Sequence, residues 1–390
     1  LVLHNYMDFD DLKDYVKISY ELTQDGLVIS KGKLPEVSAA PHSEGKINLK
    51  INVPESGKCY LKFIYHLKKE LPLLDEDHIL GFDEIEVSQK DAKCQLAEKW
   101  VEKTVTDSEL QVSEDDTQIH IKGREFAYTI DRRTALFTEM KFAGREYLNH
   151  PMELNIWRAP TDNDMYIKSE WKKAHYDKAY TRAYTTEVVQ GKHGVKITSH
   201  ASVVAETVQK ILDVTITWKI EAAGKIDADI AVTKDDEFPD LPRFGVRMFL
   251  DKKLSAARYF GMGPQESYCD KHQAASHGLY HANVDDLHED YIRPQENGSH
   301  YDCEYVELNN SRYGIVVFAE NAFSFNASYY TQEELEEKTH NYELTESDSV
   351  VFCVDYALNG IGSNSCGPVV LEQYRFDDVL FRFQFTLIPY

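Results

Sequence analysis

The sequence predicts an all-β protein built from antiparallel strands. Apolar and polar residues alternate with a period of two along several segments, whereas helical periodicity is scarce. Turn-forming residues stand between these segments, as in Gln24-Asp25-Gly26 and Ala222-Ala223-Gly224. The chain has 390 residues, which is more than one small core needs, so we expect two or three domains.

The alternation is clearest in four segments, and each is predicted to be a half-buried antiparallel strand with one face toward the core. The apolar sets are Ile47, Leu49, Ile51 and Val53; Leu212, Val214, Ile216 and Trp218; Ile226, Ala228, Ile230 and Val232; and Phe381, Phe383, Phe385 and Leu387. The best helical segment is 332–339. There Thr331 can cap the N-terminus, and the side chain of Glu334 can return the bond as a capping box.

A polar stretch from Ser88 to Lys93 marks a domain boundary between Val87 and Val105. The length and strand spacing of the part before it suit an immunoglobulin-like sandwich. We therefore predict an immunoglobulin-like β-sandwich over residues 1–90, a linker over 91–104, and one large antiparallel β-sandwich over 105–390.

Charge narrows the partners that the chain can bind. It has 43 Lys and Arg against 66 Asp and Glu, a formal net charge of −23. Nucleic acids and anionic lipid surfaces attract basic proteins, so we expect neither as a partner. No apolar run approaches the roughly 20 residues of a membrane-spanning helix. A neutral ligand or a partner chain fits this composition better.

The cysteines and the first residues predict a cytoplasmic location. The six cysteines lie far apart and include no C-x-x-C pair, so we expect reduced thiols and no zinc site. The chain opens with Leu1-Val2-Leu3 and has neither a start methionine nor the charged region of a signal peptide. We expect it to be a piece of a longer protein.

Signatures of nucleotide, zinc-protease and α/β-hydrolase sites are not found in the sequence. His272, His277, His281 and His288 bunch together, but their spacing matches no standard metal site, which favours solvated loop histidines. The string WRAPTDND covers Trp157 and the segment from Arg158 to Asp164. Its Asp and Asn side chains can either bond to the backbone and fix a tight turn, or bind sugar hydroxyls.

Two glutamates stand in similar turns, Glu266 in GPQESY and Glu296 in PQENG. A glycosidase needs two carboxylates at a defined separation, about 5 Å where configuration is retained. The sequence does not give that separation. On the motifs alone, locking of the loops is favoured over an acid/base pair.

Four strings, IWRAPTDND, GMGPQESY, YIRPQENG and NGIGSNSCGP, occur in this order along the chain. In this combination and spacing the sequence resembles the C-terminal part of the β-galactosidases of glycoside hydrolase family 2. Residues 1–87 resemble the second immunoglobulin-like domain of that family. Residues from about 100 to 390 resemble its last domain, a large sandwich of galactose-mutarotase-like topology.

The resemblance implies that the parent enzyme hydrolyses terminal β-D-galactosides by a retaining mechanism. In the family, both catalytic glutamates lie on a TIM barrel that precedes the matching segment, and the Mg and Na ligands come from that barrel and the domains before it. This chain is then a non-catalytic part with no catalytic residue, metal or cofactor of its own. Its implied partners are the missing barrel, the galactoside bound by the parent, and a second copy in a possible homo-oligomer.

The resemblance also places this part at the mouth of the active site. In the family, one aromatic residue two positions before a proline lies against the sugar pocket, and that position falls on Cys366 here. A thiol offers no stacking platform for a sugar. The same loop holds Ser363, Asn364 and Ser365. As further substrate-binding candidates we take Asn364 and Ser365, together with Arg158, Asp162, Asn163 and Asp164, whose segment we expect to continue to Ser169 as a mobile lip.

Two other functions are compatible with parts of the sequence. An aldose epimerase would share the topology of the large domain, but its histidine motif is not found, and the nearest string, Ser324 to Ser328, lacks the histidine. A free-standing carbohydrate-binding module would use exposed aromatic side chains, which the 24 tyrosines permit.

Overall fold

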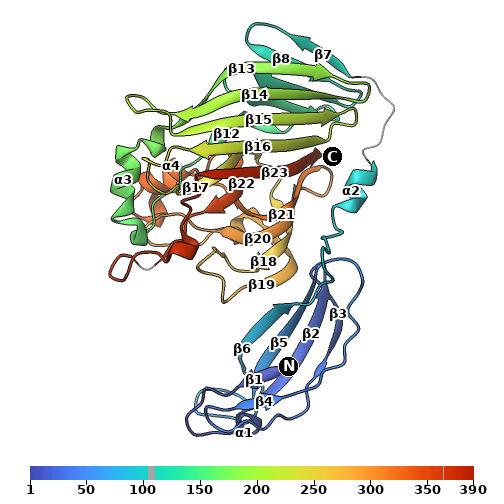
Figure 1. Cartoon of the computed structure of the whole chain (residues 1–390), viewed down its shortest axis with the longest axis vertical. Helices are drawn as coiled ribbons and strands as arrows, with labels where there is room; N and C mark the ends of the chain where they lie inside the picture. The colour runs from blue at the N-terminus through green and yellow to red at the C-terminus, as the bar shows by residue number, and fades with distance from the viewer. Residues whose placement is uncertain (104–109, 363) are drawn as a thin grey trace. The chain divides into compact units, whose positions relative to one another are not determined.

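The computed structural model describes residues 1–103, 110–362 and 364–390, and strands dominate it (Figure 1). The chain divides into two compact units. The first comprises Leu1–Leu96 with His277–Leu279, and the second comprises Ala97–Ser276 and Tyr280–Tyr390. The predicted all-β class is confirmed.

Within its described residues, the first unit holds a four-stranded antiparallel sheet in the order β3-β2-β5-β6 and a two-stranded sheet of β1 and β4. Their bounds are β1 Val2–His4, β2 Val16–Gln24, β3 Leu27–Lys33, β4 Glu44–Lys46, β5 Cys59–Leu67 and β6 Ile79–Glu86, with a short helix α1 at Leu12–Tyr15. The predicted turn at Asp25 and Gly26 joins β2 to β3, and both residues have positive φ, 47° and 78°. Leu22, Leu61 and Phe63 form the centre of the core.

The prediction of a strand over residues 47–53 is wrong, because these residues do not form the hydrogen bonds of a sheet. Ile47 is buried, and the following polar residues are exposed, so the alternation of burial is real. The segment is nevertheless irregular after β4, and the two backbone bonds between Ile47 and Leu1 are the last that continue the pairing of β1 with β4. Extended chain can alternate in burial without belonging to a sheet.

The predicted linker, residues 91–104, contains helix α2 at Glu98–Lys103. The side chain of Trp100 on this helix is buried, and its indole donates to the hydroxyl of Tyr305 at 3.1 Å. Residue 104 and the first five residues of the predicted large sandwich, 105–109, lie outside the described residues.

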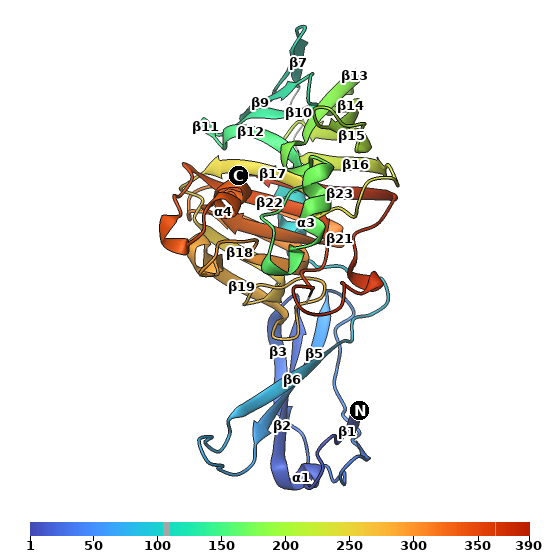
Figure 2. The ribbon, with the colours of Figure 1, turned by 90° about the vertical axis from the view of Figure 1, so that its left-hand side faces the viewer.

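In the described part of the second unit, a twelve-stranded antiparallel sheet and a five-stranded sheet of order β11-β10-β9-β8-β7 are formed. The main path of the larger sheet runs β12-β17-β22-β21-β23-β16-β15-β14-β13; off this path, β20 pairs with β21 and β18, and β18 pairs with β19 (Figures 1 and 2). The five-stranded sheet has the bounds β7 Gln111–Glu114, β8 Gln118–Lys122, β9 Phe126–Asp131, β10 Leu136–Phe142 and β11 Arg145–Glu146. The larger sheet has the bounds β12 Leu148–Asn155, β13 Tyr180–Gln190, β14 Gly194–Val204, β15 Leu212–Glu221, β16 Ile226–Lys234, β17 Arg243–Asp251, β18 Ala256–Gly263, β19 Ser276–Asn283, β20 Ser299–Asn309, β21 Gly314–Ser328, β22 Ser349–Leu358 and β23 Leu380–Pro389.

Three of the predicted strands form consecutive members of the larger sheet. Segments 212–218, 226–232 and 381–387 lie in β15, β16 and β23, which pair side by side. Ile216 pairs with Ile230, and Ile230 with Phe383, so the predicted apolar sets share one buried face. These rows form part of a continuous core with Trp218 near its centre.

Two helices of the second unit, α3 and α4, lie close to the sequence motifs or were expected from the sequence. Helix α3, Ile167–Lys173, faces the viewer in Figure 2 and follows a short 3-10 turn, η1, at Asp162–Asp164. Helix α4, Gln332–Glu337, begins at the predicted cap, where the Thr331 hydroxyl accepts from Glu334 N at 3.1 Å. The predicted capping box is wrong, because the carboxylate of Glu334 accepts from Thr345 N instead, and the helix ends two residues before 339.

Candidate functional site

The four motifs singled out in the sequence come together on one side of the second unit. The loop between β22 and β23, red in Figures 1 and 2, lies beside the segment that leads into α3. Hydrogen bonds join the two segments directly, and further bonds join them to the turns after β18 and before β20. We refer to these joined loops as the motif cluster.

The Arg158 side chain forms the centre of the motif cluster. It is fully buried and pairs with Asp164 through Nε to Oδ2 at 3.1 Å and Nη2 to Oδ1 at 2.7 Å. Its remaining donors reach the carbonyl oxygens of Asn359 and Gly360. A buried guanidinium requires acceptors of this kind, since an unpaired buried charge costs several kcal/mol, roughly 3–5 when one partner is lost.

The same carboxylate closes the turn that follows. Asp164 accepts from Thr161 N at 2.8 Å and from the Thr161 hydroxyl at 3.1 Å, which holds η1 in place. The structure thus buries Arg158 and Asp164, two of the substrate-binding candidates, and binds their polar atoms to protein groups. Asp162 is exposed and Asn163 half-buried. The expected lip to Ser169 is in part helical, because α3 begins at Ile167.

The turn before β20 is tied to this segment at two points. Asp162 N donates to the side chain of Gln295 at 3.1 Å, and Glu296 N donates to Ala159 O at 3.0 Å. The PQENG motif therefore packs on the WRAPTDND motif through its backbone and one amide side chain.

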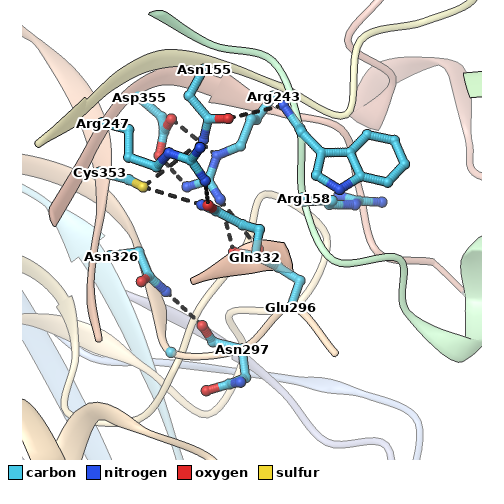
Figure 3. A network of polar contacts seen from close by, with 12 residues as sticks. Asn155, Arg158, Arg243, Arg247, Glu296, Asn297, Asn326, Gln332, Cys353 and Asp355 are labelled. Atoms are coloured by element: carbon cyan, nitrogen blue, oxygen red, sulfur yellow. Dashed lines mark hydrogen bonds and ion pairs between the residues drawn. The ribbon is translucent and has the colours of Figure 1, made fainter. Parts of the chain in front are cut away.

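The side chain of Glu296 belongs to a buried ionic cluster below the loops. Arg243 on β17 lies between Asp355 on β22 and Glu296, with 3.1 Å from its Nε to Asp355 Oδ1 and 3.2 Å from its Nη1 to Glu296 Oε2 (Figure 3). Arg243 and Asp355 are fully buried, and Glu296 is 4% exposed. Burial raises the pKa of both carboxyl groups, and the positive charge of Arg243 opposes that shift.

Glu266, the other glutamate of the candidate pair, lies in a separate set of contacts. Its carboxylate accepts from the Nζ of Lys271 and the hydroxyl of Tyr291, and from Gly298 N at 2.9 Å. Each glutamate is therefore bound by protein donors, Glu296 by Arg243 on β17 and Glu266 by groups of the neighbouring loops. This arrangement matches the loop-locking interpretation that the motifs favoured.

Cys366 lies on the segment between the final two strands, β22 and β23, and its side chain is exposed. It follows Asn364 and Ser365, both half-buried, in the same turn. Ser363 lies outside the described residues. A pocket of about 570 Å³ opens beside this turn. Residues from both motif segments line it, among them Asn163, Asp164, Tyr166, Asn359, Ile361 and Asn364.

The residues that the structure describes form no site that fits a metal ion. Across residues 1–103, 110–362 and 364–390, no three His, Cys, Asp or Glu side chains gather as metal ligands would. We therefore assign no role here to the magnesium and sodium ions implied for the parent enzyme.

Asp270 is a member of the motif cluster that the sequence did not single out. It follows GPQESY by two residues and accepts from the backbone of Ile361 and Gly362. A signal was available, because the irregular NGIG string contains backbone donors that need acceptors from elsewhere in the chain.

Comparison with known proteins identifies the family. The family described as "Beta-galactosidase, domain 4" matches residues 1–88, and the family described as "Beta galactosidase small chain" matches residues 122–387. The β-galactosidase of Actinobacillus pleuropneumoniae is 43% identical over 390 residues, which are 100% of this chain and 38% of that protein. The chain belongs to the β-galactosidase family.

A second relative agrees with this assignment. The β-galactosidase of Staphylococcus xylosus is 31% identical over 392 residues, covering 99% of this chain and 38% of that protein. The chain thus spans about 38% of the length of either relative. Among solved structures, a galactose 1-epimerase from Lactobacillus acidophilus covers 73% of this chain and 98% of its own, with a TM-score of 0.38 and 9% identity. That likeness is too weak to carry a functional argument.

No helix in the described part of the chain is both long and apolar enough to cross a membrane. Among the described residues, none of the six cysteines forms a disulfide; Cys59, Cys303 and Cys353 are buried.

Proposed function

We propose that this chain is the non-catalytic C-terminal part of a retaining β-galactosidase, and that it shapes the mouth of an active site whose catalytic TIM barrel lies elsewhere in the parent protein. The observation that carries the proposal is the match of the whole chain to about 38% of a β-galactosidase. Both candidate glutamates of this chain, Glu266 and Glu296, are held by protein donors, which suits a part without its own acid and base.

In this proposal the motif cluster faces the galactoside bound by the barrel. The exposed or half-buried polar side chains Asp162, Asn163, Asn364 and Ser365 offer hydrogen-bond partners for sugar hydroxyls. Cys366 supplies a small polarisable contact where a ring would stack. The free thiols suit a reducing compartment such as the cytoplasm. A homo-oligomer and the metal ions of the parent are part of the same proposal.

Three measurements on the purified chain separate this function from its alternatives. We expect no hydrolysis of nitrophenyl β-D-galactoside, no acceleration of galactose mutarotation in polarimetry, and no calorimetric binding of galactose at millimolar concentration. Hydrolysis that disappears in Glu266→Gln or Glu296→Gln would overturn the proposal. Catalysed mutarotation would favour an aldose epimerase, and tight galactose binding would favour a free-standing binding module.

A further inference from the structure

The segment Asn359–Gly362, here called the NGIG segment, is irregular but has a partner for every backbone polar group. The two carbonyls of Asn359 and Gly360 accept from Arg158, and those of Ile361 and Gly362 accept from the side-chain amide of Asn163. The four N–H groups are also bound: Asn359 N to Pro242 O at 3.0 Å, Gly360 N to Tyr374 O at 2.7 Å, and those of Ile361 and Gly362 to one carboxylate.

That carboxylate belongs to Asp270. Its Oδ1 accepts from Ile361 N at 3.0 Å and its Oδ2 from Gly362 N at 2.7 Å. Asp270 is itself fixed in a tight turn, because Tyr268 and Lys271 exchange backbone hydrogen bonds of 2.8 and 3.0 Å on either side of it. The nearby Lys271 side chain binds Glu266, which ties this turn to the neighbouring loop.

The glycines of the NGIG segment fit this arrangement independently. A Cβ at position 360 would lie 2.8 Å from Asp270 Oδ2, closer than side-chain atoms approach. Gly362 has a φ of +33°, and a Cβ there would lie 2.5 Å from Val370. Glycine at position 360 therefore allows the carboxylate to approach the backbone, and glycine at 362 allows the turn that follows.

Asn359 and Gly360 are buried and Ile361 and Gly362 half-buried, so their backbone groups need partners within the protein. Three side chains, those of Arg158, Asn163 and Asp270, supply six of these eight partners and hold the segment in place. The restrained segment ends at Gly362, two positions in the sequence before Asn364, where the turn that contains Cys366 begins. We propose that Asp270 and Asn163 are positioning residues, which hold the NGIG segment so that the Asn364–Cys366 turn meets the galactoside at a fixed place and thereby sets the KM of the parent enzyme. The statement about KM rests on the proposed function; the statement about the segment does not.

The first test measures the NGIG segment in the 390-residue chain by hydrogen exchange. Asp270→Asn replaces one of the two acceptor oxygens by a donor that faces an N–H group, so at least one of the amides of Ile361 and Gly362 should exchange about tenfold faster or more. The amide of Gly360, bonded to Tyr374 O, is the internal reference. A second variant, Asn163→Asp, serves if Asp270→Asn does not fold. It replaces the amide that donates to the carbonyls of Ile361 and Gly362 by an acceptor, which should loosen the same segment.

A matched control is available in Asp115, whose carboxylate also accepts two backbone N–H groups, from Thr117 at 2.7 Å and Gln118 at 2.8 Å, in the turn between β7 and β8. Both bonds end on the one oxygen Oδ1, so Asp115→Ala, which removes it, should speed exchange at Thr117 and Gln118 and leave Ile361 and Gly362 unchanged. Unchanged exchange at Ile361 and Gly362 in both Asp270→Asn and Asn163→Asp would overturn the positioning role.

The second test uses a chimera in which residues 1–390 replace the matched 38% of the Actinobacillus β-galactosidase. Asp270→Asn should raise KM for nitrophenyl β-D-galactoside about fivefold and change kcat less than about twofold, because the catalytic groups lie outside this chain. Asp115→Ala should change neither KM nor kcat. A purely structural role would lower the active fraction, and so kcat, at constant KM; that result would overturn the inference. A folded chimera without activity would instead refute the proposed function, while the exchange result would stand.

Discussion

Replacing Arg243 by methionine should destabilise the second unit more than any surface ion-pair variant. The side chain is fully buried between Asp355 and Glu296, so its removal leaves two buried carboxylates without their cation. Breaking a buried pair in this way costs about 3–5 kcal/mol, whereas losing an exposed pair costs less than about 1 kcal/mol. Arg382→Met is the matched control, because Arg382 binds Asp229 through both Nε and Nη2 but is 60% exposed.

The assay is urea unfolding at pH 7 followed by tryptophan fluorescence. All four tryptophans, at positions 100, 157, 171 and 218, lie in the second unit, so the signal reports that unit alone. The loss in free energy of unfolding caused by Arg243→Met should shrink as the pH falls toward about 4. Without the guanidinium, the pKa values of the two buried carboxyl groups are higher in the folded than in the unfolded state, so both groups protonate readily in the folded state. If Arg243→Met lowered the free energy of unfolding by less than about 1 kcal/mol, as Arg382→Met is expected to do, the reasoning would be refuted.

Three further results are expected of the same chain. Burial lowers the pKa of His300 from 6.5 to about 4, so its contribution to stability is complete above pH 6.5 and is lost as the pH falls toward 4. Between pH 7 and pH 5 the free energy of unfolding of the wild type should therefore fall by about 2 kcal/mol more than that of His300→Gln. Equal decreases in the two urea-unfolding series would contradict this. Thr331→Ala should cost about 1 kcal/mol by removing the cap of α4, whereas Thr331→Ser, which keeps the hydroxyl, should cost much less; equal costs in urea unfolding would show that the cap is unimportant. A maleimide should label exposed Cys366 well before buried Cys353, whose pKa burial raises to about 11, and similar rates in mass spectrometry would place Cys366 in the core.

The strands were predictable where alternation and pairing agree. In β15, β16 and β23 each apolar residue faces the core and also has a neighbour in register, so the period of two identified both burial and the sheet. Residues 47–53 show the same pattern without a partner strand. Pairing is a relation between distant segments, and the alternation of a single segment does not contain it.

The candidate site was predictable in composition but only partly in geometry. The four motifs named the right loops, since Arg158, Asn163 and the NGIG segment meet in one cluster. Their roles depended on burial, which short polar motifs do not reveal: Arg158 is inside and Asp162 outside, although they stand four positions apart. Asp270 lay beyond the end of its motif, and its partners are 91 and 92 residues away in the chain.

The most direct test of the central claim is the activity of the chimera with the Actinobacillus β-galactosidase. It is compared with that relative truncated before the matched segment, under identical conditions and with nitrophenyl β-D-galactoside as the substrate. If this chain is the C-terminal part of a β-galactosidase, the truncated relative should be inactive, and the chimera should regain kcat/KM to within about two orders of magnitude of the intact relative. A chimera that folds and assembles like the relative but hydrolyses no galactoside would contradict the account.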